Sequence, residues 1–183
     1  MAFIHVRSED NMALSRLAQE FAAEIAQHDW SDAPYRIDRA GHSRASDSES
    51  KRTEQVLSEK ETDRVRTNVM WVVAQTLGYS DPNFDVYEFA EACGVNTLNK
   101  RGSKDGSIAA GLRAWYGQYA RPGTWTYDPL VEVITTNTSD CYHATEQCDM
   151  FQRGYQGAPI LRFPPDAVPA KWKPCPCINV PRS

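Results

Sequence analysis

Long apolar runs are missing from this 183-residue sequence, and no stretch approaches the roughly 18–20 residues that a membrane-spanning helix needs. A large excess of one charge is also missing. The net charge is −4 at pH 7, so no bulk attraction to nucleic acid or to an anionic membrane is expected. The sequence has no glycine-rich phosphate loop and no G-x-S-x-G or H-E-x-x-H motif. The first ten residues lack the apolar core of a signal peptide, which predicts a cytoplasmic location without membrane contact.

Cysteine is present in an odd number, five, and this limits the roles that the thiols can have. In a reducing cytoplasm, cysteines are expected to be free thiols or metal ligands rather than disulfides. Hydrophobic residues make up 41% of the chain and charged residues 24%, which is ordinary for a globular protein. The length allows one domain with a substantial core or two small domains.

Residues 1–122 are predicted to form a mainly helical domain. Apolar residues recur at helical spacing in several stretches, and a Ser-x-x-Glu capping box at Ser58 marks the start of one of them. The predicted helices cover residues 9–28, 59–78, 84–93 and 107–120. Ser8 is expected to cap the first helix, after a short strand in FIHV. Residues 30–57 are polar and without periodicity, which predicts an exposed arm or linker.

Residues 123–183 are predicted to form a small β-rich module, with the boundary near Gly123. The sequence LVEVITT alternates like a strand, APILRF resembles a second strand, and the tail that follows carries six prolines. The fold class is therefore predicted as α+β, with a helical N-terminal part followed by the β-rich module. A unit of about 60 residues rarely builds a sufficient core from aliphatic burial alone, and it usually needs a metal or a neighbour.

Two short pairs of candidate metal ligands lie far apart in this module. Four residues separate His143 from Cys148, and one residue separates Cys175 from Cys177. Structural zinc sites are usually built in this way, because each pair lies on one turn and the metal joins the two turns. Thiolate and imidazole donors suit tetrahedral zinc, and a set of one His and three Cys leaves no open position. The predicted cofactor is therefore a structural zinc ion that stabilises the module.

The zinc prediction leaves alternatives open. Cys-Pro-Cys is tighter than the usual two-residue zinc knuckle, so Cys141 is an alternative ligand that could replace either member of the last pair. The thiols could instead be unbound, or Cys141 and Cys148 could form a disulfide. A short helix from Thr145 to Arg153 would place Cys148 in its first turn, where the helix dipole favours a thiolate.

Residues 135–179 resemble a small zinc-binding module that recurs in uncharacterised phage and actinobacterial proteins. The residues that carry the resemblance are Tyr142, His143, Cys148, Phe151, Gly154, Pro174 and Cys175, followed by a last cysteine. The pattern is also distantly similar to the metal-binding domain of bacterial DNA alkyl-phosphotriester repair proteins, in which two spaced ligands precede Pro-Cys-x-x-Cys. This chain departs from that pattern by its histidine ligand and by the spacing of its last pair.

The segment DPNFDVYEFAEACGV at 81–95 resembles part of small uncharacterised phage proteins with a helical hairpin. This resemblance implies a phage or prophage origin, and hence the cytoplasm of a host cell. The predicted function is that of a phage-type accessory protein, which acts by binding a host or phage protein rather than by catalysis.

Nucleic-acid binding is the first alternative function. Residues 97–122 carry five basic side chains and one acidic side chain, with aromatic residues beside them. The candidate contact residues are Lys100, Arg101, Lys104, Arg113 and Tyr116. The acidic segment 81–96 would offset their positive field, which weighs against this alternative. A metal-dependent enzyme is the second alternative.

Overall fold

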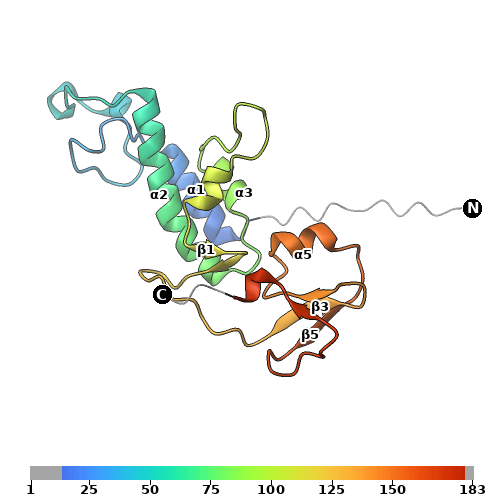
Figure 1. Cartoon of the computed structure of the whole chain (residues 1–183). Coiled ribbons are helices and arrows are strands. Elements are labelled where there is room, and N and C mark those ends of the chain that lie inside the picture. The colour runs from blue at the N-terminus through green and yellow to red at the C-terminus, as the bar shows by residue number, and fades with distance from the viewer. Residues whose placement is uncertain (1–13, 180–183) are drawn as a thin grey trace, which may run out of the picture.

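The computed structural model describes residues 14–179, with long helices in the N-terminal part and most of the strands in the C-terminal part (Figure 1). Three helices lie side by side in the N-terminal part: α1 (Arg16–Gln27), α2 (Glu59–Ser80) and α3 (Val86–Ala92). This arrangement confirms the predicted α+β class. In the part of the chain that the structure describes, no helix is both long and apolar enough to cross a membrane.

Short local signals set the starts of these helices. Ser15 caps α1 with its hydroxyl, and Ser58 and Glu61 form the predicted capping box of α2. Asp85 caps α3 by accepting hydrogen bonds from two backbone N–H groups of the first turn. The predicted strand in FIHV and the predicted cap at Ser8 lie outside the described residues, and α1 is described only from its cap onward.

The core of the helical part combines small residues on α1 with large residues on its neighbours. Ala18 and Ala22 are at most 1% exposed, so α2 and α3 can approach α1 closely. Met70 of α2 and Phe89 of α3 fill the contact and are completely buried. The helical part therefore has an apolar core of its own.

The predicted helix at 107–120 is wrong. Instead, a short helix is followed by a hairpin: α4 (Gly106–Ala110), β1 (Ala114–Trp115) and β2 (Gln118–Tyr119). Tyr116 and Gly117, between the two strands, have φ angles of 47° and 85°, and a tight two-residue hairpin turn requires such positive values. Tyr-Gly is not a usual signal for this turn. The helical spacing of the apolar residues is therefore misleading here.

The polar segment 30–57 has local structure of its own, and most of its residues are exposed or partly buried. It contains two 3-10 helices, η1 (Arg44–Ser46) and η2 (Glu49–Lys51). Asp32 and His42 are buried, and the His42 ring lies between the carboxylates of Asp32 at 3.2 Å and Asp38 at 3.5 Å. Arg36 binds the same Asp38 at 2.6 Å. These contacts give the segment local structure although its composition is polar and without periodicity.

Two small sheets and two short helical turns make up the C-terminal part. Its elements are β3 (Val133–Thr136), β4 (Cys141–Tyr142), α5 (Asp149–Gly154), β5 (Ile160–Phe163), β6 (Lys173–Pro174) and η3 (Pro176–Ile178). Strands β3 and β5 pair antiparallel, and β4 and β6 pair parallel. A bridge between Ile134 and His143 joins the two sheets. The segments 141–148 and 173–178 are thereby brought together.

The boundary near Gly123 stays a prediction, because contacts join the two parts. The buried apolar residues form two separate clusters, one in each part. However, the Gln118 side chain of β2 donates a hydrogen bond to the Cys177 carbonyl at 3.0 Å. Gly117 lies so close to Gln147 that an added Cβ would be 2.7 Å from the Cβ of that residue. The hairpin of the helical part therefore contacts the C-terminal part.

Candidate metal centre

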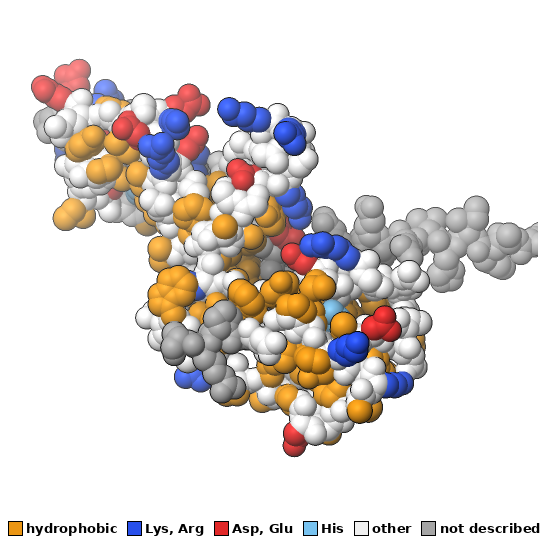
Figure 2. Space-filling model, viewed as in Figure 1, with side chains coloured by type: hydrophobic (Ala, Val, Ile, Leu, Met, Phe, Trp, Pro, Cys, Tyr) orange, Lys and Arg blue, Asp and Glu red, His pale blue; other side chains and the backbone are white. Residues whose placement is uncertain are grey.

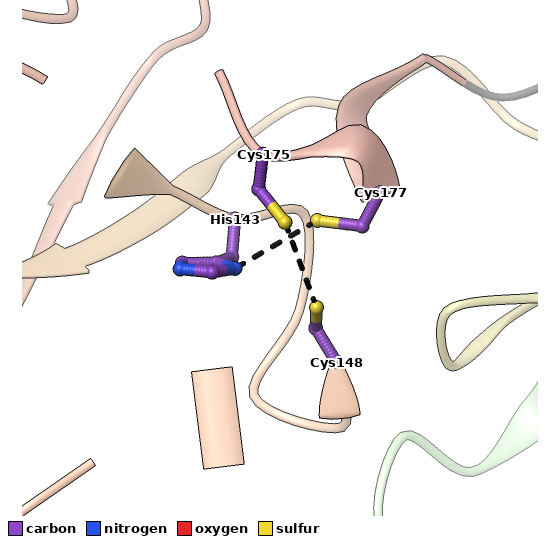
Figure 3. Close-up of side chains that lie close together, drawn as sticks. All are labelled: His143, Cys148, Cys175 and Cys177. Carbon is purple, nitrogen blue, oxygen red and sulfur yellow. Dashed lines mark hydrogen bonds between the residues drawn. The ribbon is translucent and has the colours of Figure 1, made fainter. Parts of the chain in front are cut away.

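Four of the five predicted ligand side chains meet in the C-terminal part (Figure 3). They are His143, Cys148, Cys175 and Cys177, and all four are at most 4% exposed. One ligand atom from each lies within 4.8 Å of the others. The Cys148 and Cys175 sulfurs are 3.9 Å apart, and the Cys177 sulfur is 3.9 Å from His143 Nδ1. The four side chains form a possible metal site.

Backbone hydrogen bonds hold the first ligand pair in place. His143 exchanges two such bonds with Ile134, at 2.8 and 2.7 Å, which fixes it beside β3. The Cys148 N–H donates to the Thr145 carbonyl at 3.2 Å and closes a turn before α5. The predicted helix at 145–153 is shorter in the structure and begins after Cys148, which stands at its N-cap rather than in its first turn.

The sulfurs of Cys175 and Cys177 face one point because the chain turns between these two residues. The Cys175 N–H donates to the Tyr142 carbonyl at 2.9 Å, which continues the pairing of β4 with β6. The turn of η3 follows, in which the Ile178 N–H donates back to the Cys175 carbonyl at 2.9 Å. Figure 3 shows both sulfurs pointing to the same place. The tight Cys-Pro-Cys spacing therefore does not keep either cysteine out of the group.

Cys141, the alternative ligand, is not one of the four side chains that meet. It lies in β4, where it is partly buried against the same apolar cluster, and its N–H donates to the Ser139 hydroxyl at 3.2 Å. The alternative disulfide with Cys148 is not formed either, because all five cysteines are free thiols.

The distances between the four side chains fit ligands around one ion. In a tetrahedral site with metal–sulfur bonds of about 2.3 Å, neighbouring sulfurs are about 3.8 Å apart. The observed separation of the Cys148 and Cys175 sulfurs is 3.9 Å, whereas a disulfide bond is about 2.0 Å long. The thiols are therefore placed to share a metal ion.

Burial opposes charge on these ligands when no cation is bound. It raises the pKa of the Cys175 and Cys177 thiols and lowers the pKa of the His143 imidazole. The Ala144 N–H donates to the Cys177 sulfur at 3.3 Å, and this lowers the thiol pKa only in part. A bound cation would favour the thiolates, so binding would release protons.

The cysteines themselves supply much of the core around the centre. Three of the five buried residues in the C-terminal cluster are Cys148, Cys175 and Cys177, and the other two are Ile134 and Phe151. The Met150 sulfur also lies 3.7 Å from the Cys175 sulfur, a neighbour that was not predicted. The one feature of the sequence that could have pointed to Met150 is its position two residues after Cys148. The thiols of the proposed ligands are therefore a main part of this cluster.

The predicted nucleic-acid contacts do not all lie together. Lys100, Arg101 and Lys104 share one loop, closed by a bridge between residues 98 and 104, and Figure 2 shows basic side chains at its tip. Arg113 lies elsewhere and donates to the Thr124 carbonyl at 2.6 Å. Tyr116 stands in the hairpin turn and packs against the C-terminal cluster. Three of the five predicted contacts are thus on one exposed loop.

A second group of possible ligand atoms lies in the folded segment 30–57. Atoms of Asp32, Asp38 and His42 lie within 4.8 Å of one another. Guanidinium groups already neutralise these carboxylates, because Arg36 is 2.6 Å from Asp38 and Arg44 is 3.3 Å from Asp32. The sequence offered no signal for this group, since its members have no ligand-like spacing. We assign it to the ion network that holds the segment together.

The chemical interpretation of the centre rests on its own geometry. Comparisons with known proteins found no family model, no curated protein and no solved structure that matches the chain.

Proposed function

We propose that the four side chains bind a zinc ion and that the ion is structural. Three thiolates and one imidazole are a common donor set of tetrahedral zinc sites. The observation that carries the proposal is that four buried protein donors surround one point. Four protein donors fill a tetrahedral shell, whereas a catalytic zinc keeps a position open for water or substrate. This argument supports a structural site over a metal-dependent enzyme.

Protein purified without added zinc is expected to contain about one zinc ion per chain. Elemental analysis of the full chain measures this, together with titration of the thiols under native conditions. Before a chelator is added, only Cys93 and Cys141 are expected to react, with Cys93 slow because burial raises its pKa to about 12. Less than about half an equivalent of zinc, with all five thiols reactive, would contradict the proposal.

The protein is further proposed to act by binding a protein of a host or of a phage, as a phage-type accessory protein. A groove of about 500 Å³ between the helical and C-terminal parts supports this proposal. Its walls include Tyr79, Tyr119 and Tyr127, and its rim carries an ion pair of Arg162 with Glu132. Concave surfaces that combine aromatic and polar side chains are typical of binding sites.

Nucleic-acid binding is the second candidate. It is favoured by the exposed loop that carries Lys100, Arg101 and Lys104, because clustered cations neutralise phosphates. Lys104 also lies 4.6 Å from the centre of the Tyr87 ring, which holds its charge beside an aromatic face. This loop does not line the groove, so the two candidates use different surfaces.

Affinity capture from host-cell lysate, with and without nuclease, distinguishes the two candidates. With a protein partner, the captured protein is expected to remain stoichiometric after nuclease treatment. It is also expected to be unaffected by Lys100→Glu with Arg101→Glu, because the loop lies outside the groove. With nucleic acid as the partner, the same double variant should lose most of the bound material at low salt.

A matched control for the double variant is Lys60→Glu with Arg64→Glu on α2. Both residues are exposed, and the change in net charge is the same. Equal losses in the two double variants would mean that overall charge, not the loop, controls binding. If no stoichiometric protein and no nucleic acid were recovered, both candidates would be rejected.

A further inference from the structure

A cavity of about 220 Å³ lies beside the proposed metal centre. One wall comes from the turn after β3, with Thr136, Thr138 and Asp140, and another comes from α5 and the residue that follows it. His143 is also part of the wall, whereas none of the three clustered cysteines lines the cavity. His143 is thus the only one of the four proposed metal ligands that lines the cavity.

The His143 ring presents an unpaired nitrogen to this cavity. Nδ1 faces the Cys177 sulfur, and Figure 3 shows the other ring nitrogen pointing away from the sulfurs. The residue is 4% exposed, yet among the described residues nothing hydrogen-bonds Nε2. When zinc binds Nδ1, the proton of the neutral imidazole is on Nε2. The Nε2–H donor therefore rests on the proposed zinc site. Metal-bound histidines almost always donate this N–H to an acceptor, and none of residues 14–179 supplies one here.

The turn after β3 contributes a complementary group to the lining of the cavity. The Asp140 side chain is exposed and has no ion pair or hydrogen bond with any described residue. The hydroxyls of Thr136 and Thr138 lie 3.1 Å apart and bond each other. Phe151 and Tyr155 stack with their ring centres 5.2 Å apart and give the cavity an apolar side. The cavity therefore presents one donor, one acceptor and an aromatic surface.

We infer that this cavity binds a neutral carboxamide group, such as the side chain of a glutamine or asparagine of a partner protein. The amide oxygen accepts from His143 Nε2–H, the amide nitrogen donates to Asp140, and the methylene stem packs on the two aromatic rings. A carboxylate of the same shape is repelled by Asp140, and an ammonium group cannot accept the histidine proton. A carboxamide meets both the donor and the acceptor without adding charge.

Propionamide and propionate, which have the same shape, test this inference on the zinc-loaded full chain. Propionamide is expected to shift the imidazole NMR signals of His143 saturably, with Kd on the order of millimolar, as for other very small ligands. Propionate is expected to bind about tenfold more weakly. A short glutamine peptide and its glutamate counterpart show whether a side chain can enter. Binding of free propionamide without binding of the glutamine peptide would overturn the side-chain assignment.

Two aspartate variants complete the test. Asp140→Ala is expected to weaken propionamide binding about fivefold and to leave zinc content unchanged, because Asp140 is not a ligand. Asp166→Ala, another exposed aspartate outside the cavity, is the control and should change neither. Equal binding of the two probes, no saturable shift, or an unaffected Asp140→Ala variant would overturn the inference. The zinc content of each sample is measured before the titration. A protein without zinc would contradict the proposed metal centre, whereas a zinc-loaded protein that does not bind propionamide would contradict the carboxamide inference.

Discussion

Replacing Cys175 with serine is expected to remove zinc from the protein and to unfold residues 133–178 while α1, α2 and α3 remain folded. Structural zinc contributes roughly 10–16 kcal/mol in small zinc-binding peptides at neutral pH, which exceeds the whole stability of many domains. Besides its cysteines, the C-terminal cluster has two buried residues, and we expect the remaining apolar contacts to be too few to replace the ion. The helical part keeps its own core around Phe89.

Elemental analysis and amide hydrogen exchange together measure this effect. Zinc should fall from about one ion per chain to nearly none, and exchange protection should vanish in the C-terminal part only. Cys141→Ser is the matched control, because Cys141 belongs to the same part but lies outside the group of ligands. It should retain the ion. A Cys175→Ser protein that keeps its zinc and its protection would show that the centre is not built from these residues.

Replacing Gln75 with alanine is expected to lower the free energy of unfolding of the helical part by about 3 kcal/mol. The Gln75 amide is buried in α2 and bonds the backbone just before β1 and just after β2. Its oxygen accepts from the Arg113 N–H at 2.8 Å, and its nitrogen donates to the Ala120 carbonyl at 3.0 Å. Alanine leaves these backbone groups without partners, and each buried group costs about 1–3 kcal/mol.

Urea unfolding followed by circular dichroism tests the Gln75 prediction. Asn68→Ala removes an exposed amide from the same helix and should change stability by less than about 0.5 kcal/mol. Zinc content should stay near one ion in both variants, since neither residue touches the centre. A loss below about 1 kcal/mol for Gln75→Ala would mean that the hairpin finds other partners for its backbone.

The possible ligands could be predicted from the sequence because short spacing decides their geometry. His143 with Cys148, and Cys175 with Cys177, each lie on one turn, and the structure brings the two turns together. The exclusion of Cys141 could not be predicted, because it depends on how β4 pairs with a strand more than thirty residues away. The identity of the metal and that of any partner stay predictions.

The predicted fold was right where local signals and packing agree. The capping box at Ser58 marks a helix start that the structure confirms. The helix expected at 107–120 failed, because Gln75 and the positive φ of Tyr116 favour a hairpin over the helical spacing. The local structure of segment 30–57 could not be predicted for a related reason: its ion pairs join residues that no sequence period connects.

The parallel pairing of β4 with β6 has a consequence for how the chain folds during synthesis. The His143 pair leaves the ribosome first, and 27 positions separate Cys148 from Cys175. At typical translation speeds this gap lasts about 1–5 s. During that interval half of the ligand set exists without the other half, and two donors alone hold an ion weakly. We therefore expect the metal site to close only after the second pair has been synthesised, because both pairs are needed to fill the shell.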